Sequence, residues 1–250
     1  MATIRTGGLK RPRELGEILR DAWALYRADW RGFVAIGAAT IPFALASSAV
    51  QLAIKDEVTA QLVLLAVLLS SVPPLAVIEG AVFAYVLTVA GERPGTEGQA
   101  FLSALRRLPS LAGSAFITVA VCAALFATVL LIPLGVVLLV RWVFAVPAVM
   151  FDGDSAVSSL RRSAALVMGR WWVTFGRVAA IGLLVLAVNL ALLNLVARAP
   201  AAVFALVTAI GEAFTMPFFA VALALMYFDL KARKAQTAPS AGEQSEADAG

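Results

Sequence analysis

Long apolar stretches alternate with short charged segments along this chain of 250 residues. A helix of about 20 apolar residues crosses the hydrocarbon layer of a bilayer, and six stretches are long enough to do so. They predict membrane-spanning helices at residues 33–54, 58–90, 111–131, 133–151, 173–197 and 201–228. The expected fold class is therefore all-α, a polytopic membrane helical bundle with about six transmembrane helices.

The second apolar stretch, 58–90, is too long for one upright span. It contains Pro73 and Pro74, which remove two backbone donors and favour a kink or a break. The favoured interpretation is one long kinked span. The alternative is a span followed by a re-entrant segment.

Three charged segments have apolar residues at helical spacing, as expected for amphipathic helices lying in the membrane interface. They occupy residues 12–31, 97–109 and 155–172, and each precedes a pair of predicted spans. The chain thus divides into a basic N-terminal tail (1–11), a six-span membrane domain (12–231) and a C-terminal tail (232–250). The C-terminal tail is rich in Ala, Gln, Glu and Ser, so we expect it to be disordered.

The distribution of positive charge predicts the orientation. Of the 20 Lys and Arg residues, 17 lie before the first span, in or beside alternate gaps, or after the last span. Only Lys55 and Arg198 fall in the other gaps, and Arg141 lies within a span. Short segments rich in Lys and Arg stay in the cytoplasm. We therefore expect a multi-pass protein of the cell membrane with both termini cytoplasmic.

Composition narrows the chemistry. The chain is 61% hydrophobic and 14% charged, far from the balance of a soluble domain. It has no histidine and one cysteine, Cys122, which excludes histidine metal sites, triads that contain histidine and an intrachain disulfide. We expect no catalytic residues, no metal and no cofactor. The net charge of +4 comes from the predicted inner face, so nucleic acid is not an expected partner.

Three ionisable residues, Glu79, Arg141 and Glu212, lie about halfway along their predicted spans. Isolated charges at that depth are costly, so we expect these three to form one intramembrane cluster. Two interpretations stay open: a structural ion pair that fixes helix register, and a site for an ion, a proton or a head group. Asn189 and Asn194 are expected to form hydrogen bonds between helices.

The arginines of the amphipathic segments are candidate contacts for lipid head groups. They are Arg20, Arg27, Arg106, Arg107, Arg161, Arg162 and Arg170. Each such charge near the surface attracts an anionic leaflet by about 1 kcal/mol. The expected partners are therefore the lipid bilayer, anionic head groups of the cytoplasmic leaflet and another membrane protein.

Three segments carry a resemblance to a known family: PRELGEILRDAWALYRADWRGFVAIGAATIP, RWVFAVPAVMFDGDSAVSSLRRSAALVMGRWW and MPFFAVALALMYFDLKARK. Together they resemble the glycerophosphoryl diester phosphodiesterase membrane domain family and its uncharacterised bacterial relatives, over about residues 12–234. The chain departs from the pattern at Phe151-Asp152, where relatives carry a glutamate near the loop entrance. The catalytic barrel of some members needs histidines, so the resemblance implies the membrane part only.

These observations favour a non-enzymatic integral membrane protein, a scaffold or accessory component in envelope or lipid metabolism. The alternative is a small transporter or lipid-handling carrier that uses the charges in the middle of the membrane.

Overall fold

A computed structural model describes residues 9, 11–54 and 56–237, and within them it contains helices and no strands. The α-helices are α1 (Leu15–Ala28), α2 (Trp30–Gly37), α3 (Ile41–Ala53), α4 (Glu57–Val89), α5 (Glu97–Leu105), α6 (Leu108–Phe126), α7 (Ile132–Trp142), α8 (Ala145–Asp152), α9 (Ala156–Val167), α10 (Trp171–Val196) and α11 (Ala201–Thr237). Two 3₁₀ helices, η1 (Ala38–Thr40) and η2 (Val129–Leu131), lead into α3 and α7.

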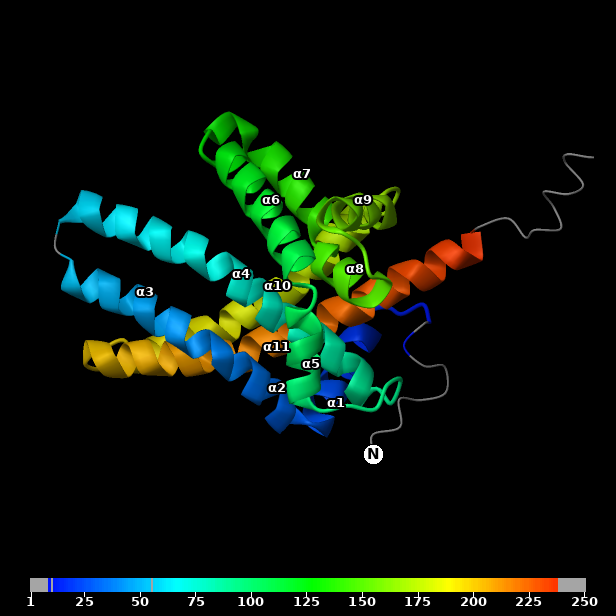
Figure 1. Cartoon of the computed structure of the whole chain (residues 1–250), viewed down its shortest axis with the longest axis horizontal. Helices are drawn as coiled ribbons and strands as arrows, with labels where there is room; N and C mark the ends of the chain where they lie inside the picture. The colour runs from blue at the N-terminus through cyan, green and yellow to red at the C-terminus, as the bar shows by residue number, and fades with distance from the viewer. Residues whose placement is uncertain (1–8, 10, 55, 238–250) are drawn as a thin grey trace, which may run out of the picture.

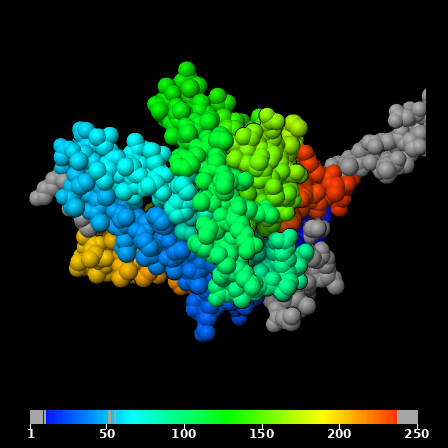
Figure 2. All heavy atoms as spheres, viewed as in Figure 1, coloured from blue at the N-terminus to red at the C-terminus, as the bar shows by residue number. Residues whose placement is uncertain are grey.

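Three helical hairpins, α3–α4, α6–α7 and α10–α11, diverge from a common hub (Figure 1). The hub contains α1, α2, α5, α8 and α9, with the C-terminal halves of α4 and α11. The α3–α4 and α10–α11 hairpins run in the same direction from the hub, while the end of α6–α7 stands apart from them (Figure 2). Each of the three predicted units, an amphipathic helix followed by a pair of spans, is present in this arrangement.

Six helical segments are long and apolar enough to cross a membrane, so the chain is a multi-pass membrane protein. They are Trp30–Val50, Glu57–Val89, Leu108–Phe126, Val129–Asp152, Trp171–Val196 and Ala201–Gln236. This confirms the predicted all-α fold class and the approximate position of every span.

The boundaries differ from the prediction in three places. Residues 57–89 form one continuous helix with Pro73 and Pro74 inside it, so the re-entrant alternative is wrong. The fourth span is broken near Phe144 into α7 and α8. The last helix continues to Thr237, which is six residues beyond the predicted end of the membrane domain. The rest of the predicted disordered tail, 238–250, lies outside the described residues, as do residues 1–8.

The amphipathic helices form where predicted, but their apolar faces cover protein as well as membrane. In α1, Ile18, Ala22 and Leu25 are buried, and the helix packs on α11. Helix α5 buries Ala100 and Ala104 against α4, and α9 packs on α6, α7 and α8. The apolar stripes of α1, α5 and α9 therefore complete the hub, a role that the sequence analysis did not anticipate.

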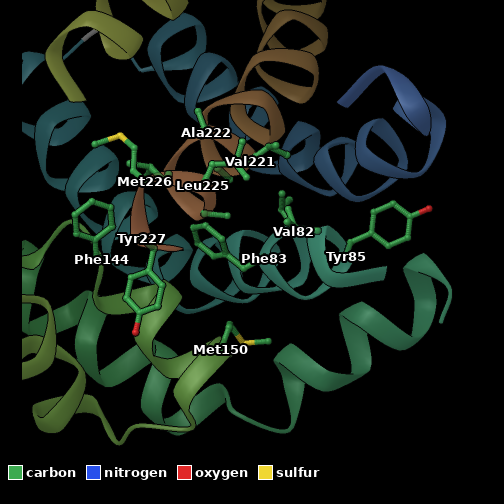
Figure 3. Close-up of a cluster of buried hydrophobic side chains, with 14 of the residues drawn as sticks. Val82, Phe83, Tyr85, Phe144, Met150, Val221, Ala222, Leu225, Met226 and Tyr227 are labelled. Atoms are coloured by element: carbon green, nitrogen blue, oxygen red, sulfur yellow. The ribbon is translucent and has the colours of Figure 1, made fainter. Parts of the chain in front are cut away.

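The hydrophobic core lies where α4, α8 and α11 meet. Its central residues come from three segments: Val82 and Phe83 from α4, Phe144 and Met150 from around α8, and Val221 to Tyr227 from α11 (Figure 3). Tyr85 and Tyr227 lie at its edges with their hydroxyl groups pointing outward (Figure 3). These hydroxyls donate to Asp29 and Asp152, respectively, which ties the core to the charged surface of the hub.

Candidate functional site

A polar cavity of about 750 Å³ lies between the α3–α4 and α10–α11 hairpins. We call it the carboxylate cavity. Its polar lining is Thr40, Ser47, Ser48, Ser71, Glu79, Asn189, Thr208, Glu212 and Thr215, and apolar residues that include Phe43, Met216 and Phe219 complete it. Glu212 lies 11 residues after the start of α11, about 16 Å along the helix at a rise of 1.5 Å per residue. Glu212 therefore lies well inside the candidate span of α11.

The hydroxyl groups of the cavity donate their hydrogens to nearby backbone carbonyls. Each donates to a backbone carbonyl three or four residues earlier, at 2.8–3.1 Å, as is common for serine and threonine in apolar helices. The six pairs are Thr40 to Gly37, Ser47 to Phe43, Ser48 to Ala44, Ser71 to Leu68, Thr208 to Ala205 and Thr215 to Gly211. What these side chains can offer a ligand is therefore oxygen lone pairs.

Asn189 follows the same rule. Its amide nitrogen donates to the Val185 carbonyl at 2.9 Å and to the Thr215 hydroxyl at 3.3 Å, so both of its hydrogens are occupied. The second bond joins α10 to α11, as predicted from the sequence. Asn194 donates only to Leu190 in its own helix at 2.8 Å, so an interhelical bond from it is not formed.

Glu79 and Glu212 face this cavity from α4 and α11, and among the described residues neither carboxylate has a hydrogen bond or an ion pair. The described lining contains no Lys or Arg. A carboxylate in an apolar environment is costly unless a cation or a proton accompanies it. The cavity thus combines two acidic groups with acceptor oxygens and offers no spare donor.

Arg141 does not join the two glutamates, and the predicted cluster of three is corrected to a pair. Helix α7 packs on α6, α9 and α10, and Arg141 lies at its end, just before the break at Phe144. The Ser163 hydroxyl bridges this break: it donates to the Arg141 carbonyl at 2.6 Å and accepts from the Phe144 N–H at 3.1 Å. Because Ser163 belongs to the amphipathic α9, Arg141 lies level with that helix and not in the carboxylate cavity.

A second hollow, the aromatic groove, has a volume of about 500 Å³ and is almost entirely apolar. Its lining is Trp23, Tyr26, Arg27, Trp30, Leu184, Val185, Val188, Phe214, Thr215 and Phe218. Burial raises the pKa of Tyr26 to about 12, so its hydroxyl stays protonated and donates to the Phe214 carbonyl at 3.0 Å. Val185 and Thr215 line both the groove and the carboxylate cavity.

The hub contains a buried ionic network that the sequence analysis did not single out. Asp229 is fully buried and accepts from the Arg13 backbone N–H at 2.6 Å, from Arg177 at 2.6 Å and from Arg233 at 2.8 Å. Arg13 is also buried, and its guanidinium donates to Asp21 at 2.9 Å. This network joins the segment before α1 to α10 and α11. The sequence feature that could have indicated this network is Arg177, a cation in the first turns of a largely apolar span.

Asp152 and Asp154 form a smaller network at the end of α8. Asp152 accepts from Lys231 at 2.6 Å and from Tyr227, while Asp154 pairs with Arg162. Ser155 is the N-cap of α9 and accepts from the Ser158 N–H at 3.5 Å. The short acidic loop is therefore a helix start and a hub contact.

The predicted head-group arginines separate into two sets. Arg107 donates to the Val149 carbonyl and Arg162 pairs with Asp154, so these two are engaged within the protein. The others have exposed side chains on the hub surface: Arg20, Arg27, Arg106, Arg161 and Arg170. The second set is the more available to lipid head groups, although Arg20 also donates to the Gly16 carbonyl at 3.3 Å and the paired Arg162 side chain is 47% exposed.

Comparisons of the chain with protein-family models, with curated proteins and with solved structures find no match. The chemistry of the two hollows and the hub therefore carries the functional argument.

Proposed function

We propose that this protein is an integral membrane carrier that binds a small organic cation in the carboxylate cavity. The observation that carries the proposal is the lining itself, in which Glu79 and Glu212 share one cavity with hydroxyl groups that offer only acceptors. A ligand that supplies positive charge and N–H donors complements such a lining, whereas an anion would find no donor.

The size of the cavity favours an organic cation over a bare metal ion. Small-molecule sites have volumes of about 300–1,000 Å³, and the carboxylate cavity falls within that range. Phe43 and Phe219 add aromatic faces to the lining, and aromatic faces attract ammonium groups. The proposed cargo class is therefore a primary amine or guanidine.

Binding of n-butylammonium to the protein in phosphatidylcholine nanodiscs tests the proposal. We expect saturable binding by isothermal titration, weakened at least about tenfold by Glu79→Gln or Glu212→Gln, since each removes one charge from the site. The matched controls are n-butanol and butyrate, which keep the chain and lack the cation. Equal binding of all three probes, or no effect of either substitution, would overturn the proposal.

Transport is tested separately in proteoliposomes by uptake of radiolabelled n-butylguanidinium, which stays charged at neutral pH and therefore does not cross the bilayer as a neutral base. A carrier should move this cation down its gradient faster than protein-free liposomes do. The double variant Glu79→Gln/Glu212→Gln should return the rate to that background while the protein remains folded.

We further propose that the hub faces the cytoplasm of a bacterial cell membrane, with both termini inside. The support is the concentration of Lys and Arg in α1, in α9, in the last turns of α11 and at Arg106 and Arg107 directly after α5. A reporter fused after Lys234 should be cytoplasmic and a tag inserted at Asp56 should be external. The reverse labelling would contradict this orientation.

The second candidate is a scaffold or accessory protein without enzymatic activity, in line with the resemblance to the membrane domain family. It is supported by the exposed arginines of the hub: Arg20, Arg27, Arg106, Arg161 and Arg170. Native-lipid particles separate the two candidates. A stoichiometric protein partner or enriched anionic lipid supports the scaffold, and a retained amine supports the carrier.

A further inference from the structure

We infer that the cargo is an amphipathic amine, which places its cationic head in the carboxylate cavity and its hydrocarbon tail in the aromatic groove. The inference rests on the proposed function and specifies its substrate class. Its basis is that two hollows of opposite chemistry share a wall, formed by Val185 of α10 and Thr215 of α11.

The groove has the properties of a site for a hydrocarbon chain. Trp23 and Trp30 are 55% and 45% exposed, so the groove is open at the surface of the protein. Its aromatic walls are held by ring contacts between the first helices and α11: Trp30 stacks on Phe214 at 6.3 Å, and Tyr26 meets Phe218 edge-on at 6.0 Å. An apolar chain that leaves the bilayer can therefore enter a preformed slot.

The Tyr26 and Thr215 hydroxyl groups that line the groove already have hydrogen-bond partners within the protein, so they offer a ligand little. The Tyr26 hydroxyl is occupied by the Phe214 carbonyl, and the Thr215 hydroxyl donates to Gly211. Arg27 is the one charged residue in the described lining of the aromatic groove. It disfavours an ammonium group within the groove, so an amphipathic amine whose tail occupies the groove keeps its head on the acidic side of the shared wall.

The shared wall is held by one weak polar contact. Thr215 accepts from Asn189 at 3.3 Å, and Val185 accepts from the same amide. Interhelical hydrogen bonds of this kind in membranes contribute only about 0.6 kcal/mol on average. Moving the Asn189 and Thr215 side chains apart therefore loses little hydrogen-bond energy, and the inference requires such a movement to connect the two hollows around a bound chain.

The test compares n-butylammonium with n-dodecylammonium in phosphatidylcholine nanodiscs, at matched mole fractions in the membrane. We expect the longer amine to bind at least about tenfold more tightly at equal membrane concentration, because its tail packs more closely against the aromatic walls of the groove than against lipid chains. Phe218→Ala should remove most of that gain and leave butylammonium unchanged. The matched control is Leu195→Ala, which changes a side chain that is 80% exposed near the far end of α10.

A dodecylammonium probe with a diazirine in its tail locates the chain directly. Photolysis should label groove residues of α1, α2 and α11 in preference to the rest of α10, and Glu79→Gln/Glu212→Gln should abolish that preference. Dodecanoate with the same diazirine is the head-group control, and equal labelling by it would overturn the inference. If butylammonium binds but the long tail adds nothing and labels no groove residue, the inference fails and the proposed carrier stands. If neither amine binds, both fail.

Discussion

The buried carboxylate of the hub and the two carboxylates of the cavity have opposite surroundings. Asp229 has no exposed surface and receives three donors, two of them guanidinium groups. Glu79 and Glu212 share a cavity, and among the described residues they have no donor at all. Asp229, near the C-terminal end of α11, is thus paired with cations, whereas Glu212, 17 residues earlier in the same helix, lines a cavity without any among the described residues.

This difference separates charge that holds the fold from charge that is open to a ligand. A buried charge whose partners come from three segments fixes how those segments meet, and removing one partner leaves the others uncompensated. Glu79 is half-buried and Glu212 is exposed, and carboxylates without a partner do not fix the fold in this way. The comparison therefore predicts that stability depends on the hub network and that binding depends on the cavity.

The largest expected effect is that of Asp229→Asn. The substitution keeps the size of the side chain but leaves Arg177 and Arg233 without a counter-charge, so we expect the free energy of unfolding to fall by about 3–5 kcal/mol. The measurement is unfolding by dodecyl sulfate in mixed micelles. Glu79→Gln and Glu212→Gln are the matched controls, and each should change it by less than about 1 kcal/mol. Equal losses in all three variants would remove the distinction between hub and cavity.

A smaller effect is expected at Gly37, where α2 passes close to α11. A Cβ at this position would collide with the Ala213 carbonyl oxygen and lie 2.8 Å from Pro217 Cγ. Gly37→Ala should therefore cost about 1–3 kcal/mol. It should also weaken butylammonium binding, because Ala213 is next to Glu212.

The control for Gly37 is Gly182→Ala. No atom lies within 4 Å of a Cβ added there, and the residue is inside α10. Alanine is the better helix former, so we expect no loss and a gain of up to about 1 kcal/mol. A loss at Gly182 as large as that at Gly37 would mean that the close contact is not the cause.

The hydrogen bond in the wall between the two hollows should contribute less to the free energy of unfolding than the contacts considered so far. A double-mutant cycle with Asn189→Leu and Thr215→Val isolates their hydrogen bond, for which we expect a coupling energy of about 0.6 kcal/mol. Asn194→Leu is the control, since Asn194 bonds only within its own helix. A coupling energy above about 2 kcal/mol would show a rigid wall and argue against passage of a chain between the hollows.

Hydrophobic periodicity was sufficient to predict the fold class, the six spans and the three amphipathic helices. The thickness of the membrane and the pitch of the helix determine these features from short stretches of sequence. Whether an amphipathic helix covers lipid or protein is not local, and the docking of α1 on α11 depends on residues about 200 positions apart. The Asp229 network was missed for the same reason, since Arg13 and Asp229 are 216 residues apart.

The candidate site was predicted in part. Depth along a straight helix identified Glu79 and Glu212, and the structure places both in one cavity. The same argument failed for Arg141, because it assumed that the fourth span continues unbroken. Depth also gave no information on which helices are neighbours, and α7 is remote from the cavity because it packs with α6 and α9.

Arg141 therefore provides the smallest expected effect and a direct test of this correction. A cycle that combines Arg141→Gln with Glu212→Gln, and a second with Glu79→Gln, should give coupling energies within about 0.5 kcal/mol of zero, as expected for distant residues without shared partners. Arg141→Gln should also leave butylammonium binding unchanged. The measurements are the dodecyl sulfate unfolding and the nanodisc titration described above. A coupling energy above about 1 kcal/mol with either glutamate would restore the cluster of three and with it the structural interpretation of these charges, because a cation within reach would then already neutralise the cavity.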